Sequence, residues 1–216
     1  MSIKIPFDIE MEGEVVKANG EWGVILAPAE KLKMNEGILP HLSKKLREKD
    51  ISSLRFNFPF QMKKQNKADS PQILDLAYLE VWNYAISKFP DKKWCVGGIG
   101  IGGLTALRVA SISYADFGIP PTICISYPMY PPNRPELVDT SALTALMGDG
   151  LFCQGSKSNR GTDDRLKNQT TMMARHAKVS RIGGANHLME VEGKPANTVA
   201  FWIATDIGKF LRDLRY

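Results

Sequence analysis

The stretch that decides the fold is KWCVGGIGIGG, residues 93–103. It joins an apolar run with strand character to five glycines within seven residues, and the helical pattern of TALRVAS follows. Glycine is the residue that permits a sharp turn and a close approach of two backbone segments. We therefore expect a strand over residues 93–99, a tight turn, and a helix over residues 103–115 packed against that strand.

Strands and helices alternate along the chain on both sides of this turn. Apolar runs predict further strands over residues 22–28, 52–58, 122–127, 150–154 and 177–182, with two weaker ones near residues 3–11 and 14–18. Apolar residues recur at helical spacing near residues 38–46, 73–84, 163–175 and 199–214, and Ser70-Pro71 is a typical helix start. We predict one α/β domain over residues 1–216, a three-layer α/β/α sandwich around a mainly parallel sheet of about eight strands. Ligands of such sheets bind beyond the carboxyl ends of the strands.

Composition and charge exclude several classes of protein. Of 216 residues, 44% are hydrophobic and 24% charged, as in soluble globular domains and unlike disordered or coiled-coil chains. The net charge is +5, but the basic residues are scattered and lack interleaved aromatic side chains, so we expect no nucleic-acid partner. No apolar run approaches the roughly 20 residues of a membrane span, and the N-terminus does not resemble a signal peptide. We therefore expect no membrane partner and a cytoplasmic location.

The cysteines and histidines do not form a metal-binding pattern. Cys95, Cys124 and Cys153 lie in separate apolar runs without CxxC spacing, and the three histidines of the chain are scattered. We expect reduced cysteines in the core of the protein, no metal and no cofactor.

Two functional patterns fit the glycine stretch, and a purely structural turn is a third interpretation. The first is the nucleophile elbow G-x-S-x-G of α/β hydrolases, which would span residues 98–102 with Gly100 in place of the reactive residue. The second is the dinucleotide fingerprint G-x-G-x-x-G, formed by Gly98, Gly100 and Gly103. The acid that such a site needs about 20 residues later is missing from TICISYP, residues 122–128, and the sequence favours the elbow.

Five motifs follow five successive predicted strands in a definite order. They are RFNFPF (55–60), the glycine turn, SYPMYPPNRP (126–135), QGSKSNRGT (154–162) and NHL (186–188). This order resembles the small, lidless α/β hydrolases related to dienelactone hydrolase, and RFNFP and YPxxPP are its specific parts. The chain is most similar to the branch that includes testis-expressed protein thirty and the hydrolase-like region of non-specific-lethal complex subunit three. The resemblance implies an α/β-hydrolase sheet without a lid domain and, for an active member, hydrolysis of carboxylic esters.

The resemblance also assigns the catalytic positions. The nucleophilic serine of the family falls on Gly100, the acid on Ser158 and the histidine base on His187. A serine hydrolase needs all three groups, and only the base is kept. Asp163 or Asp164, a few residues past the acid position, is an alternative acid.

The groups expected to stabilise an oxyanion are kept only in part. The oxyanion turn of the family, H-G-A-G, falls on PAEK, residues 28–31, which places Ala29 at a donor position. Glu30 would add a negative charge where one should develop during the reaction. The second donor, the backbone N–H of Ile101, is intact.

Large apolar side chains are expected at the rim formed by the carboxyl ends of the strands. We predict that Phe58, Phe60, Tyr127, Met129 and Tyr130 wall an apolar binding pocket there.

Together, these features predict an α/β-hydrolase-fold protein with a degenerate triad. We expect it to bind a small molecule or a protein partner through the old catalytic cleft without catalysis. A weak ester or lactone hydrolase that uses His187 and water is a second hypothesis. A nucleotide-binding module built on Gly98, Gly100 and Gly103 is a third.

Overall fold

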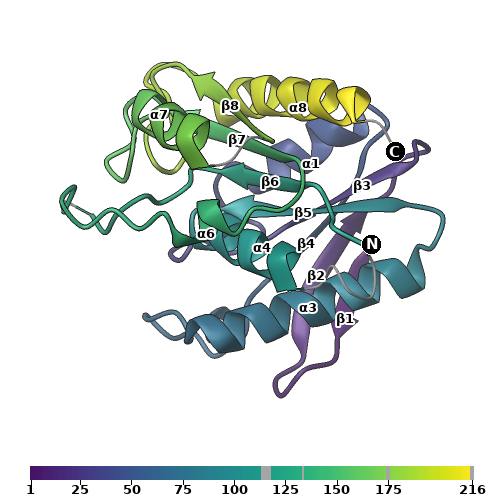
Figure 1. Ribbon diagram of the computed structural model, residues 1–216. Coiled ribbons are helices and arrows are strands. Elements are labelled where there is room, and N and C mark those ends of the chain that lie inside the picture. Colours follow the sequence, from purple (N-terminus) through teal and green to yellow (C-terminus); the bar gives the residue numbers. More distant parts are fainter. Residues whose placement is uncertain (113–117, 133, 174–175, 215–216) are drawn as a thin grey trace.

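The computed structural model describes residues 1–112, 118–132, 134–173 and 176–214 (Figure 1). Within them, eight strands form one sheet in the order β1-β2-β4-β3-β5-β6-β7-β8. The strands are β1 (Ser2–Ile5), β2 (Met11–Val16), β3 (Trp22–Leu26), β4 (Ser52–Phe56), β5 (Lys93–Ile99), β6 (Thr122–Ile125), β7 (Gly150–Gly155) and β8 (Ala177–Ile182). The strand β2 pairs antiparallel with β1 and β4, and the other pairs are parallel. The predicted mainly parallel sheet of eight strands is confirmed.

The longer helices follow the predicted order, whereas the four-residue helix after β4 was not predicted. The helices are α1 (Leu39–Arg47), α2 (Pro59–Met62), α3 (Pro71–Lys88), α4 (Ile101–Ile112), α6 (Ser141–Thr144), α7 (Asp163–Met173) and α8 (Ala196–Asp213). The helix α4 begins two residues before the predicted start. The predicted helical residues 113–115 and 174–175 lie outside the described residues. None of the described helices is long and apolar enough to cross a membrane.

Helices cover both faces of the sheet, with α8 along one side and α3 along the other (Figure 1). Alternate residues of β3 point to opposite faces: Val24 and Leu26 pack with α1 and α8, whereas Ile25 packs with α3 and α4. On the α4 side, a further apolar cluster joins α6 and α7 to β6 and β7. The central strands are therefore buried on both faces, which explains why their sequences are continuous apolar runs. The three-layer arrangement is confirmed.

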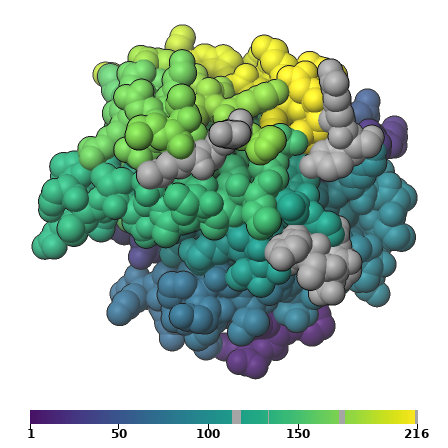
Figure 2. Space-filling view, in the orientation of Figure 1, coloured from purple at the N-terminus to yellow at the C-terminus, as the bar shows by residue number. Residues whose placement is uncertain are grey.

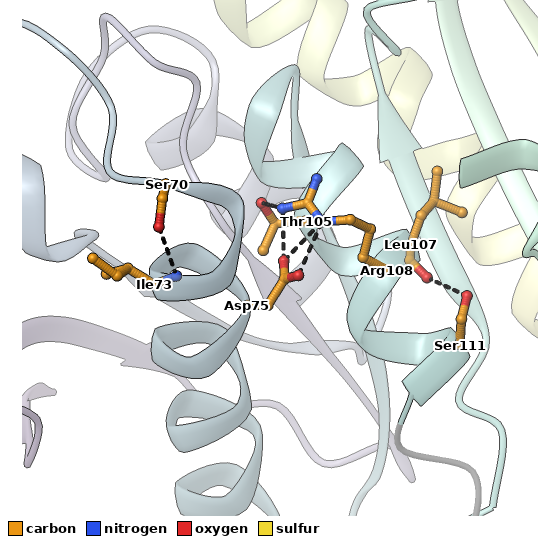
Figure 3. A network of polar contacts seen from close by, with 7 residues as sticks. All are labelled: Ser70, Ile73, Asp75, Thr105, Leu107, Arg108 and Ser111. Carbon is orange, nitrogen blue, oxygen red and sulfur yellow. Dashed lines mark hydrogen bonds and ion pairs between the residues drawn. The ribbon is translucent and has the colours of Figure 1, made fainter. Parts of the chain in front are cut away.

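An ion pair joins α3 to α4, the helix that follows the glycine turn. Arg108 donates from Nε and Nη2 to the carboxylate of Asp75 at 2.6 to 3.0 Å, and Nη2 also donates to Thr105 Oγ1 at 3.1 Å (Figure 3). A two-point contact between a guanidinium and a carboxylate fixes direction as well as distance. The pair thus holds α4 against its neighbour.

The carboxyl ends of the parallel strands form the open edge of the molecule. The connection from β6 to β7 projects there (Figure 2), and among its described residues the only helix is the four-residue α6, so no lid domain is built. The neighbours β3 and β5 form a switch point, because the chain continues to β4 on one side and to β6 on the other. Such switch points are where open α/β sheets bind their ligands.

Candidate functional site

Gly100 occupies the turn between β5 and α4, with a φ of +55°. A Cβ atom added at Gly98 or at Gly102 would lie 2.6 Å from the backbone oxygen of Ala27. A Cβ atom added at Gly100 would meet no atom closer than 3.5 Å. The close approach of the backbones therefore requires Gly98 and Gly102, whereas Gly100 has room for a side chain and only its left-handed φ favours glycine. This is the shape of a nucleophile elbow whose central side chain is missing.

His187 lies in the loop after β8 and faces Gly100. Its Nε2 atom would be 3.5 Å from a Cβ atom at Gly100. The loop is shaped by Asn186, whose Oδ1 accepts hydrogen bonds from the backbone N–H groups of Leu188 and Glu190 at 2.9 and 3.0 Å. An asparagine that bonds its own loop in this way fixes a turn. The two positions that the resemblance assigns to the nucleophile and the base are adjacent in space.

The other ring nitrogen of His187, Nδ1, lies beside two serine hydroxyls. Ser126 Oγ is 2.9 Å away and Ser158 Oγ, at the predicted acid position, is 3.4 Å away. Ser126 directly follows β6, is fully buried and has a φ of +55°, which is uncommon for a residue other than glycine. Sequence reasoning missed Ser126. Its local signal is only a place at the end of a strand, and its contact with His187 spans 61 residues.

The structure pairs the alternative acids, Asp163 and Asp164, with Arg181. Both carboxylates, in the first turn of α7, face Arg181 of β8, at 3.0 and 3.6 Å. Negative charge is favourable in the first turn of a helix, and Arg181 pairs with one oxygen of each acid, while Asp163 Oδ1 is buried without a hydrogen-bond partner among the described residues. Among the described residues, neither carboxylate forms an ion pair or hydrogen bond with His187.

Burial, together with the charge of Arg160, lowers the pKa of His187 to about 4. A carboxylate beside Nδ1 would act in the opposite direction and raise this pKa. The imidazole is therefore neutral at physiological pH and is a weak base. The hydroxyls of Ser126 and Ser158 also carry no charge that could stabilise an imidazolium during catalysis.

Polar residues of the RFNFPFQ stretch hold the loop after β3, where the resemblance expects the oxyanion turn. Asn57 Oδ1 accepts a hydrogen bond from the N–H of Met34 at 2.8 Å. Gln61 Nε2 donates to the carbonyl of Ala29 at 3.2 Å. The Cβ atom of Ala29 lies 3.9 Å from the position of a Cβ atom at Gly100. The most specific motif of the chain thus positions a loop and does not itself reach the site.

Gln154 of β7 holds together the loops that carry Ser126 and Ser158. Its Oε1 accepts from the N–H of Tyr127 at 2.8 Å, while Nε2 donates to the carbonyls of Tyr127 and Gly161 at 3.1 and 2.5 Å. Because both amide hydrogens and the amide oxygen are used, this fully buried side chain is satisfied. It fixes both hydroxyls relative to the sheet.

A cavity of about 520 Å³ opens over Gly100 and His187. Ala29 and Ile101, the two predicted oxyanion positions, both line it. The charged residues Glu30, Lys31, Lys157 and Arg160 line it as well. Its volume lies within the range of small-molecule sites.

The five residues predicted to form an apolar wall of the pocket lie elsewhere in the structure. Phe58 and Phe60 are buried and stack on one another in the core beside α3. Tyr127 and Met129 are buried in the cluster with α6 and α7, and Tyr130 packs beside it. None of these five described residues lines the cavity. Their burial removes more apolar area from water than a place at an open rim would.

The described residues offer neither a reactive thiol nor a metal-binding cluster for another kind of catalysis. Burial raises the thiol pKa of Cys95, Cys124 and Cys153, so these residues stay protonated in the core. In the part of the chain that the structure describes, no group of three or more His, Cys, Asp or Glu residues could hold a metal ion.

Solved structures of several hydrolases share this fold. A serine hydrolase homologue from Coxiella burnetii matches with a TM-score of 0.74 and 16% identity, over 100% of this chain and 97% of that chain. Dienelactone hydrolase from Anabaena variabilis matches with 0.75 and 16%, over 100% and 98%. A serine hydrolase without lid from Xanthomonas campestris matches with 0.74 and 13%, over 98% and 93%. At these identities the likeness concerns the fold alone.

Comparison with known protein families identifies the family of the chain as well as its fold. Residues 23–207 match the family described as "Alpha/beta hydrolase domain", and this match runs from β3 into α8. It includes the glycine turn, the loop of His187 and the strands that carry them. The chain belongs to the alpha/beta hydrolase domain family.

Proposed function

We propose that this α/β-hydrolase-fold protein has a degenerate catalytic triad and binds a ligand through the old active-site cavity without hydrolysing it. The observation that carries the proposal is Gly100: a left-handed turn with room for a side chain, opposite a histidine, with no side chain present. We also propose that the chain belongs to the branch of testis-expressed protein thirty and non-specific-lethal complex subunit three, on the RFNFP and YPxxPP motifs.

The serines near His187 do not replace the missing nucleophile. Ser126 and Ser158 lie on the Nδ1 side of the ring, whereas the cavity at Gly100 lies on the Nε2 side. Ser126 is fully buried and Ser158 is buried, and neither lines the cavity. Among the described residues, a substrate carbonyl in the cavity would therefore find no hydroxyl within attacking distance.

The test is a turnover assay with a panel of short aryl esters and thioesters. We expect rates equal to those of buffer for the wild-type protein, for His187→Ala and for His176→Ala, a matched control at an exposed histidine. Turnover that is lost in His187→Ala and kept in His176→Ala would overturn the proposal.

Weak hydrolysis by His187 and water is a second candidate. The space between His187 Nε2 and Gly100 favours this candidate. A water molecule there could lose a proton to Nε2 and attack a substrate without a covalent intermediate. With a pKa of about 4 for His187, the rate would rise through pH 4 and stay level above it. A fluorophosphonate probe would leave no adduct, and a rate that still rises above pH 6 would count against His187 as the base.

A nucleotide-binding module is the third candidate, and the structure offers it less support. Gly98 is explained by contact with the backbone of Ala27, and Gly103 by contact with Cys124 Sγ, 2.5 Å from an added Cβ atom. Ser126 stands at the end of β6, where an acid that binds ribose would be expected, and its hydroxyl contacts His187. Thermal stabilisation by NAD at millimolar concentration would support this candidate, and an unchanged melting temperature would remove it.

A further inference from the structure

We infer that the cavity over Gly100 binds the anionic group of a small organic acid, a carboxylate or a phosphate monoester carried on a compact apolar body. The inference rests on the proposed function and names the ligand class of the same cavity. Its first basis is charge: Lys31, Lys157 and Arg160 line one cavity, and Glu30 is the only acidic residue among its described lining residues.

These cations have few partners within the protein. In the described ranges 1–112, 118–132, 134–173 and 176–214, Lys31, Lys157 and Arg160 form no ion pair. Arg160 is partly buried, and the charge of Glu30 acts on it. Among the described residues its side chain donates one hydrogen bond, from Nε to the carbonyl of Tyr130 at 3.4 Å, so its terminal amino groups can serve a ligand. A planar guanidinium is suited to a two-point contact with carboxylate or phosphate oxygens.

The second basis is the hydrogen bonding of His187. In a working triad, a carboxylate accepts from Nδ1–H, and Nε2 is left as the base. Here Nδ1 faces two hydroxyls, and Ser158 Oγ already accepts a hydrogen bond from the N–H of Arg160 at 3.3 Å. The hydrogen of Ser158 is then free to point to Nδ1. A neutral imidazole that accepts at Nδ1 carries its own hydrogen on Nε2.

With two hydroxyls beside Nδ1 in place of a carboxylate, we assign the ring hydrogen of His187 to Nε2, which then donates into the space over Gly100. The twelve-residue helix α4 begins at the same space, because Gly100 and Ile101 both line the cavity, and the start of a helix favours negative charge. Apolar side chains of Ala29, Pro132 and Leu188 line other parts of the cavity and would contact the body of the ligand.

The first experiment measures binding by calorimetry with four probes: benzoate, phenyl phosphate and their neutral counterparts benzamide and phenol. We expect the two anions to bind and the neutral compounds to bind at least about tenfold more weakly. Preference for one anion identifies the carboxylate or the phosphate as the natural group. Equal binding of charged and neutral probes, or no binding of either anion at millimolar concentration, overturns the inference.

Substitutions of single cationic residues test where the anion binds. We expect Arg160→Gln to weaken anion binding about tenfold, and Lys178→Gln, which removes an exposed charge from β8, to leave binding unchanged. Equal weakening by both variants would show general electrostatic attraction and would contradict the site. The melting temperature of each variant is measured alongside, so that loss of fold is recognised.

A third measurement determines which ring nitrogen of His187 carries the hydrogen in the wild-type protein. Nitrogen chemical shifts of uniformly labelled wild-type protein distinguish a protonated Nε2 from a protonated Nδ1, with His187→Gln used to assign the signal. We expect the hydrogen on Nε2, and a hydrogen on Nδ1 would contradict the inference. If the hydrogen is on Nδ1, or if the anions do not bind, the anion-binding inference is wrong. The proposed lack of catalysis is tested separately, by the ester assay.

Discussion

Gly100 occupies the turn between β5 and α4 where, on the proposed function, the family's nucleophile would stand. A non-glycine residue with a left-handed φ costs about 1–3 kcal/mol, which a nucleophile elbow normally bears for the sake of catalysis. Glycine at φ +55° removes that cost without altering the turn. The neighbouring glycines are held by a different cause, because backbone oxygen atoms fill the space where their Cβ atoms would be.

Two alanine substitutions separate these causes. Gly100→Ala should fold and lose about 1–2 kcal/mol of unfolding free energy, because only its φ is strained. Gly98→Ala should lose at least about 3 kcal/mol, because its Cβ atom would overlap the oxygen of Ala27. Urea denaturation measures both. If Gly100→Ala costs as much as Gly98→Ala, position 100 has no room for a side chain and the elbow interpretation is wrong.

The pKa of His187 makes a prediction about stability and pH. Burial and the charge of Arg160 lower it from 6.5 to about 4, so between these pH values the unfolded chain binds a proton that the folded chain does not. Stability contributed by the neutral imidazole is complete above pH 6.5 and is lost as the pH falls toward 4, by roughly 3 kcal/mol in all.

The control for this prediction is His187→Gln, which cannot titrate and keeps a polar side chain. Its unfolding free energy should fall less between pH 6.5 and 4.5 than that of the wild-type protein. If the two proteins lose stability in parallel, the pKa of His187 is not lowered and Arg160 does not act on it.

Strands and helices differ in how well the sequence predicts them, and the difference has physical causes. The bounds of β5 and β8 follow from apolar runs that polar residues or a turn interrupt. The start of α4 does not, because Gly102 and Gly103 have poor helix propensity, and close packing against β3, β5 and β6 keeps them in the helix. Phe58 and Tyr127 are the last residues of two predicted strands, but β4 and β6 end two residues earlier, and sequence alone cannot tell a rim from a core. The role of Ser126 could not be predicted, because the residue that it contacts, His187, lies 61 positions away in the sequence.

Tyr78 links α3 to β5 next to the glycine turn, and its substitution tests how this contact between the two elements supports the fold. Its buried hydroxyl accepts from the N–H of Gly97 at 2.6 Å and donates to the carbonyl of the same residue at 2.8 Å. Tyr78→Phe should leave that N–H without a partner and cost about 1–3 kcal/mol in urea denaturation. Tyr84→Phe, on the same helix and half-exposed, is the matched control and should cost less than about 0.5 kcal/mol. Equal costs would show that the hydroxyl of Tyr78 does not support the strand.

The sheet as a whole brings the site together. Loops after β3, β5, β6, β7 and β8 meet at the switch point beside β3 and β5, and the cavity that they form contains His187. Sequence order and the resemblance predict which loops meet there. They do not predict that a hydroxyl would replace the carboxylate beside Nδ1 or that cations would line the cavity, because both depend on side-chain directions in the folded chain.

Whether any nucleophile remains in this cavity is tested most directly by mass. The intact protein is incubated with a fluorophosphonate probe that forms a stable adduct with activated serines, and unfolded protein serves as the control for non-specific labelling. With Gly100 at the nucleophile position and Ser126 and Ser158 buried on the far side of the imidazole, we predict that the mass does not change. An adduct on the folded wild-type protein that is lost in His187→Ala would show an activated serine and contradict a site built for binding alone.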